Sequence, residues 1–300
     1  MIDSATKEEV LIEALPYIQT YEGKTFVIKY GGAVMTDERL KQTFAKDVTI
    51  LRKIGINIII VHGGGKEITD TASALGIETK FVDGQRYTDE KMIEVVLMVL
   101  AGVINKEIVN LINTNGGNAV GLCGVDNLLL KARKLSNNGT DLGLVGEIVS
   151  VNVPFLNLLL QNGMMPVIAP LGVGDNGQLY NINADLAAGA VAAALKAEKL
   201  VYLSDTQGIM VNEHRISTLT KSKANSLIID GAIFGGMIPK VQSAFDTLDA
   251  GVNKVHIIDG RIKHSLLLEI FTDEGIGTQM VHEEATASSS SGNDGLQHRA

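Results

Sequence analysis

Two lysines stand beside glycine pairs in distant parts of the chain, and both could bind a transferring phosphoryl group. Lys29 ends an apolar stretch just before Gly31–Gly32, and Lys240 lies four residues after the pair Gly235–Gly236. Ammonium groups beside bare backbone suit phosphoryl transfer, which needs positioning and charge neutralisation more than covalent help. A snorkelling edge lysine is the plainer interpretation of either residue alone. Together they predict a phosphotransferase, provided that the fold brings both amines to one point.

A third glycine-rich segment, VHGGGKEI, lies between an apolar run and a helical pattern. Backbone N–H groups at such a helix N-terminus attract anions. A dinucleotide fingerprint is excluded because Ile68 stands in place of its third glycine, and a Walker A loop because Ile60 and Glu67 replace its required residues. A tight turn explains one such loop. Two loops on successive parallel strands instead open at the same edge of the sheet, where ligands bind.

Polar side chains elsewhere complete the candidate site. Asn181, Asn183 and Asp185 precede an alanine-rich helical segment, where a single helix cap would suffice. We therefore expect Asp185 to hold the two lysines in place and Asn181 to bind a polar group of the substrate. Arg86, within DGQRYTDEK, is either a solvated loop residue or a bidentate clamp for a substrate carboxylate.

Other residues give weaker signals. Asp205 and Gly208 end an apolar strand, where nucleotides bind in α/β proteins, although a turn explains them equally well. Cys123 is the single cysteine, so no disulfide forms within the chain, and its apolar surroundings favour a small buried hydrophobe over a nucleophile. No Cys/His cluster has metal-site spacing, so we expect no metal held by the protein.

The elements that must position these residues alternate between strands and helices. The strands are continuous apolar runs, which indicates a mainly parallel sheet covered on both faces by helices, and hence an α/β fold. The expected strands are residues 25–30, 57–62, 118–124, 164–172, 199–205 and 254–260. The expected helices are residues 7–22, 37–55, 66–76, 89–116, 153–163, 184–197 and 239–251.

The chain divides into four expected regions. Residues 1–22 form an amphipathic helix that we expect to kink or break at Pro16, and it packs either on its own domain or on another subunit. A first lobe covers residues 23–173 and a second covers residues 174–284, with a boundary in LGVGDNG. The tail at 285–300 is of low complexity, and we expect it to be disordered.

The bulk composition narrows the class of partner. The net charge of −8 is a poor match for nucleic acid or an anionic membrane, so we expect neither as a partner. We also count no apolar run of transmembrane length. The acidic N-terminus lacks a signal-peptide core, so we expect a cytoplasmic protein, or a stromal one if the chain is plastid-encoded.

Taken together, the motifs resemble the amino acid kinase family, and within it most closely the arginine-sensitive acetylglutamate kinases. Each motif alone is weak, whereas their order and spacing over residues 8–282 are highly specific. The matching segments are VIKYGGAVM, IIVHGGGKEI, DGQRYTDEKM, AVGLCGVDN, VIAPLG, YNINADLAAG, LSDTQGI, GGMIPKV and HIIDGRIKHSLLLEIFTDEGIGTQM.

The resemblance implies an open αβα sandwich with two lobes, one for the acyl substrate and dimerisation, the other for ATP. The implied reaction is ATP-dependent phosphorylation of the γ-carboxylate of N-acetyl-L-glutamate, with Mg²⁺ arriving on the nucleotide phosphates. Lys29 and Lys240 would be the transition-state lysines, and Asp185 would organise them. Acetylglutamate would bind at Gly64, Gly65, Arg86 and Asn181, and ATP at Gly31, Gly32, Asp205, Gly208 and Gly236.

The resemblance also implies regulation and assembly. Arginine-inhibited members have a kinked helix before the first strand, which links dimers into a hexameric ring, a trimer of dimers. Arginine binds them near a C-terminal segment similar to GRIKHSLLLEIFTDEGIGT. We therefore expect inhibition by arginine, with His264, Glu269 and Gly277 as candidate contacts. Some photosynthetic organisms control such enzymes with a PII signalling protein, which makes that protein a candidate partner.

Three alternatives remain. The first is a related kinase acting on glutamate, aspartate, carbamate or UMP, against which Arg86 and Asn181 in their motifs favour acetylglutamate. The second is a non-enzymatic sensor of ATP or arginine, although the presence of every core lysine argues against it. The third is a nicotinamide-dependent dehydrogenase, which the failed fingerprint disfavours. One departure from the family pattern is Lys66, where proline is common, and it could add a third positive charge near the phosphates.

Overall fold

The computed structural model describes residues 4–82, 84–136 and 140–283, and of residues 4–11 and 33 it describes the backbone alone. The tail for which we expected disorder, 285–300, lies outside these described residues.

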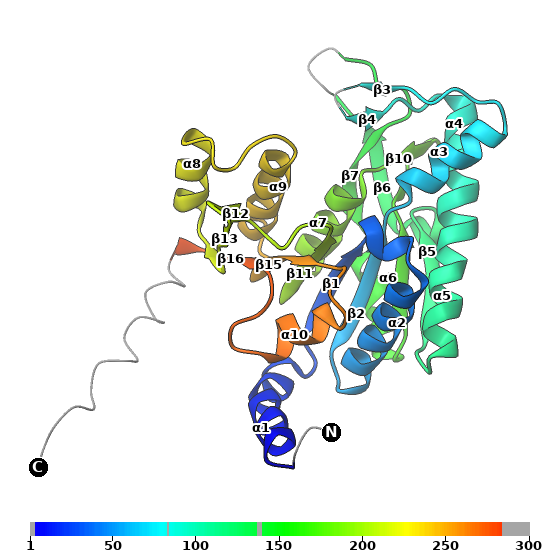
Figure 1. The fold of residues 1–300 in the computed structure, drawn as a ribbon. Coiled ribbons are helices and arrows are strands. Elements are labelled where there is room, and N and C mark those ends of the chain that lie inside the picture. Colours follow the sequence, from blue (N-terminus) through cyan, green and yellow to red (C-terminus); the bar gives the residue numbers. More distant parts are fainter. Residues whose placement is uncertain (1–3, 83, 137–139, 284–300) are drawn as a thin grey trace, which may run out of the picture.

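An eight-stranded sheet forms the centre of the molecule (Figure 1). Every neighbouring pair in it is parallel except one, in which β15 and β16 run antiparallel. In order across the sheet, the strands are β14 (Thr218–Leu219), β16 (Thr278–Met280), β15 (Lys254–Asp259), β11 (Lys199–Ser204), β1 (Thr25–Tyr30), β2 (Asn57–His62), β8 (Met165–Ala169) and β5 (Ala119–Cys123). This arrangement confirms the α/β fold with a mainly parallel central sheet.

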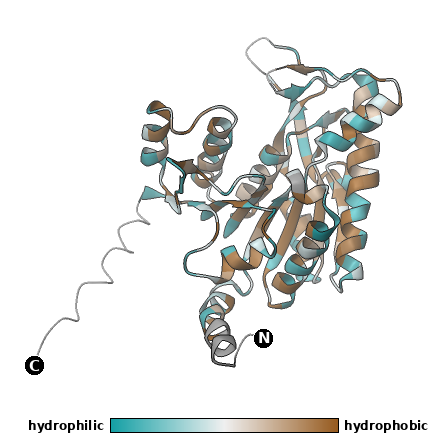
Figure 2. Ribbon diagram, viewed as in Figure 1, coloured by the Kyte–Doolittle hydropathy of each residue, from teal (hydrophilic) through white to brown (hydrophobic). Residues whose placement is uncertain are grey.

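Helices cover both faces of this sheet, and each face has its own core. Successive strand residues point to opposite faces, so Phe26 and Ile28 enter one core while Val27 enters the other. Figure 2 shows the apolar strands enclosed between the helices. The first face packs against α2 (Glu38–Lys53), α3 (Gly65–Ala74), α4 (Glu90–Leu97), α5 (Asn105–Thr114) and α10 (Ser265–Phe271). The second packs against α6 (Val153–Gln161), α7 (Ala184–Leu195), α8 (Lys221–Ile229) and α9 (Met237–Asp249).

Smaller sheets flank the central one. A four-stranded sheet has the order β10–β9–β6–β7, and two hairpins pair β3 with β4 and β12 with β13. The expected lobe boundary falls in the β9–β10 hairpin, and the central sheet takes strands from both sides of it. The bounds are β3 (Phe81–Val82), β4 (Gln85–Arg86), η3 (Asp126–Leu128), β6 (Leu130–Lys134), β7 (Gly146–Val151), β9 (Leu171–Val173), β10 (Leu179–Asn181), β12 (Met210–Val211) and β13 (His214–Arg215).

The long helical region Glu90–Thr114 contains a π-helical segment, η2 (Met98–Ile104), between α4 and α5. By length and composition alone this run could cross a membrane, which corrects our count of apolar runs. Core helices of globular proteins pass the same test, and 44% of its most apolar window is buried inside the molecule. Its residues pack on α3 and β5, and we interpret it as a core helix.

The N-terminal helix α1 (Ser4–Tyr21) extends beyond the sandwich and packs beside α10 (Figure 1). Pro16 lies inside it and does not end it, so of the kink or break that we expected, the break is absent. The side chains of Ile12 and Leu15 are more than half exposed, at 63% and 52%. In contrast, Tyr17 and Tyr21 turn towards the body of the protein and pack on its core.

Candidate active site and a second cavity

The candidate catalytic residues meet where the central strands end. After β1, the chain forms β2 and β8 on one side of β1 in the sheet. It then forms β11 on the other side of β1. This reversal makes the carboxyl ends of β1 and β11 a topological switch point, where open parallel sheets bind ligands. Lys29 is near the end of β1, and Asp205 directly follows β11. Helix α7 begins beside them and supplies Asp185.

Lys29 forms an ion pair with Asp185, with 3.0 Å between Nζ and Oδ1. The side chain that caps α7 is Asn183, whose Oδ1 accepts hydrogen bonds from the backbone N–H groups of Asp185 and Leu186 at 2.9 and 3.2 Å. The Asp185 carboxylate is therefore not used as a helix cap and can hold Lys29. This division of roles agrees with the expectation that one cap would suffice.

Lys240 reaches the same place from the first turns of α9. Its Nζ donates to Ser204 Oγ at 3.5 Å, at the end of β11. Burial lowers the pKa of Lys240, Asp185 raises it, and the positive charge of Lys29 lowers it again. An electrostatic effect of one amine on the other requires proximity. The structure thus brings Lys29, Lys240 and Asp185 together from three separate elements.

Two glycines show why side chains are excluded from this edge. Gly32 has φ of +73°, and a Cβ there would lie 2.4 Å from Asp205 Oδ1. Gly64 has φ of +155°, and its Cβ would lie 2.3 Å from Cδ1 of Ile104, in the π-helical segment. Any side chain at either position would be strained and would also displace a neighbour.

The remaining candidate glycines lie around the same edge. Gly31 lies beneath the Lys29 amine, since a Cβ there would be 2.7 Å from Nζ. Gly236 is the N-cap of α9, four residues before Lys240. Gly208 follows β11 but packs against Thr278, where a Cβ would lie 2.6 Å from Oγ1. Gly208 thus has a packing role that the motif did not indicate.

A cavity of about 240 Å³ opens at this edge of the sheet, and its lining ends at Ala184, the residue before Asp185. Its walls come from the glycine loop after β2, the β3–β4 hairpin and the start of α7, and they include Gly64, Gly65, Arg86 and Asn181. Asn181 donates through Nδ2 to Thr88 Oγ1 at 3.1 Å, which fixes its amide. The four residues assigned to the acyl substrate therefore share one cavity.

Arg86 is the charged group of this cavity, and it is only 8% exposed. Its Nη2 donates to Gly65 O at 2.7 Å and to Thr69 Oγ1 at 2.8 Å, and its guanidinium carbon lies 4.9 Å from the centre of the Phe81 ring. Burial lowers the pKa of Arg86. Among the described residues, no carboxylate pairs with it. A buried cation without a counter-ion is suited to bind an incoming anion.

Two residues that the sequence did not single out support the glycine loop. His62 is fully buried, and burial lowers its pKa to about 4, so the ring is neutral at pH 7. Its Nδ1 donates to Gly63 O at 2.8 Å, and its Nε2 accepts from Asn105 Nδ2 at 3.3 Å. Asn105 also donates to Val167 O at 2.9 Å. A histidine at a strand end was the available signal, but nothing in the sequence paired it with Asn105.

The structure also bears on three points for which the sequence signals were weaker: Lys66, Cys123 and a metal site held by the protein. Lys66 points along its own helix to Asp70, 2.5 Å away, and its side chain is 71% exposed. Cys123 is buried, which raises the pKa of its thiol, as suits a small hydrophobe. Among the residues the structure describes, no cluster of three or more His, Cys, Asp or Glu side chains could hold a metal ion.

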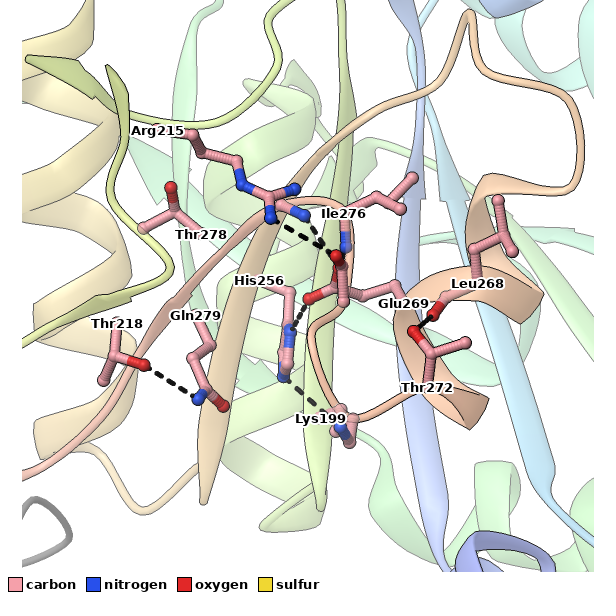
Figure 3. A network of polar contacts seen from close by, with 12 residues as sticks. Lys199, Arg215, Thr218, His256, Leu268, Glu269, Thr272, Ile276, Thr278 and Gln279 are labelled. Carbon is pink, nitrogen blue, oxygen red and sulfur yellow. Dashed lines mark hydrogen bonds and ion pairs between the residues drawn. The ribbon is translucent and has the colours of Figure 1, made fainter. Parts of the chain in front are cut away.

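A second cavity, of about 450 Å³, lies at the opposite edge of the sheet, beside the amino ends of β11 and β15. Figure 3 shows its polar network. Lys199 and His256, from those two strands, lie 3.4 Å apart between Nζ and Nε2. His256 Nδ1 lies 2.6 Å from Glu269 Oε1, and the other carboxylate oxygen accepts from the N–H groups of Ile276 and Gly277 at 2.7 and 2.9 Å.

Burial sets the protonation of this network. It lowers the pKa of His256 to about 4 and that of Lys199 to about 8. A neutral His256 donates from Nδ1 to Glu269 and accepts at Nε2 from Lys199, which satisfies all three groups. Helix α1 closes the cavity through the Tyr17 hydroxyl, which donates to Asp273 and whose pKa that bond raises to about 12.

The candidate regulatory residues divide between two places. Glu269 and Gly277 line this second cavity, as does His256, which the sequence did not suggest. His264 lies outside it, because its Nδ1 pairs with Asp47 Oδ1 on α2 at 2.6 Å. The turn after β15 directs His264 towards α2, so His264 and Glu269 do not line the same cavity.

Comparisons with known proteins show the family of this chain. Residues 24–259 match the amino acid kinase family. Acetylglutamate kinase of Chlorobaculum tepidum is 57% identical over 274 residues, which cover 91% of this chain and 96% of that protein.

Solved structures are also similar to this chain. N-acetylglutamate synthase from Neisseria gonorrhoeae, complexed with coenzyme A and N-acetyl-glutamate, superposes with a TM-score of 0.82 at 29% identity, over 92% of this chain and 63% of that one. Its complex with coenzyme A and L-arginine gives 0.79 at 28% identity, over 91% and 65%. Carbamate kinase from Giardia lamblia bound to AMP-PNP gives 0.62 at 16% identity, over 87% and 99%, which is a likeness of fold alone.

Proposed function

The chain belongs to the amino acid kinase family and is an enzyme of that family, and on this premise we propose that it phosphorylates N-acetyl-L-glutamate. The γ-phosphoryl group of ATP passes to the γ-carboxylate, giving N-acetyl-L-glutamyl 5-phosphate in the second step of arginine biosynthesis. The name of the relative at 57% identity supports this substrate. The observation that carries the proposal is the cavity with an unneutralised Arg86 at the same sheet edge as the Lys29–Asp185–Lys240 cluster.

The proposed chemistry needs no general base. A γ-carboxyl group has a pKa of about 4.3, so it is already ionised at neutral pH. One of its oxygens attacks the γ-phosphorus, the bond to the β–γ bridging oxygen breaks, and ADP leaves with the electron pair. Lys29 and Lys240 neutralise charge on the transferring group, and Asp185 holds the lysines without taking a proton.

The substrate's other charged group accounts for Arg86. With the γ-carboxylate at the lysines, the α-carboxylate would bind the guanidinium of Arg86, which lines the cavity. Asn181 also lines the cavity and can bind the polar acetamido group. ATP would enter from the β11 side, past Gly32 and Asp205, with Mg²⁺ held mainly by phosphate oxygens.

The test is an assay of acyl phosphate formation from ATP, trapped with hydroxylamine, in parallel on N-acetyl-L-glutamate and free L-glutamate. We expect hydroxamate from acetylglutamate alone. Product from free glutamate but none from acetylglutamate would contradict the substrate assignment, and no product from either would contradict kinase activity on this class.

We also propose that arginine inhibits the enzyme by binding in the second cavity. The cavity carries charges of both signs, with Lys199 and Arg215 facing Glu269 and Asp273, which suits an amino acid with a cationic side chain. The synthase structure with L-arginine, similar at a TM-score of 0.79, lends support. Undiminished turnover in saturating arginine, in the same assay, would refute this proposal.

A hexamer built through α1 is a further part of the proposal. The exposed apolar side chains Ile12 and Leu15 on a helix outside the sandwich suit a contact with another subunit. Light scattering should show six chains for the natural protein and a smaller assembly, of dimers, for Leu15→Glu. A Leu15→Glu protein that remains hexameric would exclude this role for α1.

A further inference from the structure

The Arg86 side chain is held by a hydroxyl on the neighbouring helix. Thr69 lies one turn after Gly65, and its Oγ1 donates to Gly65 O at 3.0 Å. The same Oγ1 accepts from Arg86 Nη2 at 2.8 Å, and Nη2 also donates to Gly65 O at 2.7 Å. A hydroxyl can donate and accept at once, so these three groups close a ring of hydrogen bonds.

An aromatic ring holds the guanidinium from its face. Phe81 pairs with Arg86 across the β3–β4 hairpin, and its ring centre lies 4.9 Å from the guanidinium carbon. This ring remains 57% exposed and forms part of the cavity wall. A cation over an aromatic face is favourable, but that contact leaves rotation in the guanidinium plane open. The hydrogen bonds to Nη2 remove this rotation.

The contacts with Thr69, Gly65 and Phe81, which together form a clamp on Arg86, leave Nη1 without a protein partner. Nη1 is buried and has no hydrogen-bond partner among the described residues. A buried donor without a partner carries a desolvation cost that a ligand oxygen can relieve. Because Nη2 is occupied by Thr69 and Gly65, the orientation of the rest of the guanidinium, Nη1 included, depends on those two contacts.

We propose that Thr69 is a positioning residue that orients the Arg86 guanidinium so that Nη1 meets the α-carboxylate of the acyl substrate. This inference rests on the function proposed above. Thr69 does not line the cavity, so it acts through Arg86 and not on the substrate. The side-chain hydroxyl is the group required, whereas the helix needs only a residue that packs.

The decisive comparison is between Thr69→Val, which keeps the shape and removes the hydroxyl, and Thr69→Ser, which keeps the hydroxyl. Losing one hydrogen bond to a charged group should raise KM for acetylglutamate about 5–20-fold in Thr69→Val. The kcat and the KM for ATP should stay near the natural values, and Thr69→Ser should restore KM. Thr71→Val is the matched control, since Thr71 is on the same helix and makes no hydrogen bond to Arg86.

Each outcome decides between a positioning role and a packing role. An unchanged KM in Thr69→Val, or failure of Thr69→Ser to restore it, would overturn the proposal. So would equal losses in Thr69→Val and Thr71→Val, because packing defects on α3 would then be sufficient. If Thr69→Val does not fold, Phe81→Leu tests the same clamp from its other side and should raise the same KM. A natural enzyme inactive on acetylglutamate would overturn the proposed function and, with it, this inference.

Discussion

The first cavity lies at the carboxyl ends of β2 and β8, whereas the second cavity lies at the amino ends of β11 and β15. In the first, the buried Arg86 has no carboxylate partner among the described residues. In the second, Glu269 is bound by His256 and two backbone N–H groups, and His256 by Lys199. The first cavity therefore contains a charged group without a counter-ion, whereas in the second cavity Glu269, His256 and Lys199 already bind one another.

This difference indicates how each cavity would respond to a ligand. An anion entering the first gains a cation that is already desolvated and oriented, so binding there needs little rearrangement. A ligand entering the second must replace or extend existing hydrogen bonds. Such exchange changes the positions of side chains, and Tyr17 of α1 donates to Asp273 in the lining of the same cavity. Preorganisation suits catalysis, and replaceable bonds suit regulation.

The strongest test of the first cavity is Lys240→Ala. Losing one of the two charges that face the transferring phosphoryl group should lower kcat about 10²–10³-fold, by analogy with lost oxyanion donors, and change KM little. Steady-state hydroxamate kinetics measure both constants. Lys66→Ala is the matched control, because that exposed lysine pairs with Asp70 and should leave kcat nearly unchanged. A near-normal kcat in Lys240→Ala would contradict the catalytic role.

Replacing Arg86 should have the next largest effect. Arg86→Lys keeps a positive charge but loses the planar fork that Thr69 and Gly65 orient, so KM for acetylglutamate should rise about 10–100-fold. The KM for ATP should hardly move. Equal increases in both Michaelis constants would show that Arg86 supports the whole site and not the acyl substrate.

In the second cavity, Glu269→Gln should weaken inhibition by arginine about 10-fold, since a neutral amide loses one charge-assisted contact. The inhibitor concentration for half-maximal activity measures this change, and uninhibited kcat should persist because the catalytic edge is distant. His264→Gln is the control: the histidine lies outside the cavity, so its variant should be inhibited normally. Strong loss of inhibition in His264→Gln alone would reverse our assignment of the two residues.

The smallest expected effect concerns pH. The pKa of His256 falls from an ordinary 6.5 to about 4 on folding. Between these values the unfolded chain binds a proton that the folded chain does not, so stability is full above pH 6.5 and declines as pH falls towards 4. At pH 5 the loss from this residue should be about 1–2 kcal/mol.

Urea unfolding at neutral pH and near pH 5 measures this loss, with His256→Gln as the comparison. The natural protein should lose more stability than the variant over that interval. Part of the loss should remain in His256→Gln, because His62 at the other cavity has a similarly lowered pKa. An identical pH dependence in both proteins would show that His256 is not buried in its neutral form.

Much of the fold followed from local patterns. Continuous apolar runs predicted a parallel sheet, and the runs at 25–30, 57–62 and 199–205 are three adjacent strands of it. The assignment of Asn183 or its neighbours as a helix cap also held, because capping depends on residues within one turn. At Pro16 we expected a kink or a break, and the helix continues through the proline without a break.

The residues of the candidate site also divide into those that the sequence indicated and those that it did not. The lysines, the glycines and Asp185 could be identified as candidates because each of them stands in a short motif that can be recognised from its immediate neighbours in the sequence. Thr69, His62, Asn105, Lys199 and His256 were missed, since each acts through a partner distant in sequence. His264 and Glu269 are five residues apart, yet they face different sides of α10 and contact different elements.

By itself, the sequence determined which groups the protein can use: two lysines beside bare backbone, a guanidinium, a carboxylate before a helix, and strands apolar enough to be buried on both faces. Tertiary structure alone decided which of these groups meet. The pairing of Lys29 with Asp185, the hydroxyl that orients Arg86 and the separation of two cavities to opposite sheet edges all depend on strand order. Strand order arises from long-range burial of apolar faces, and no local spacing of residues encodes it.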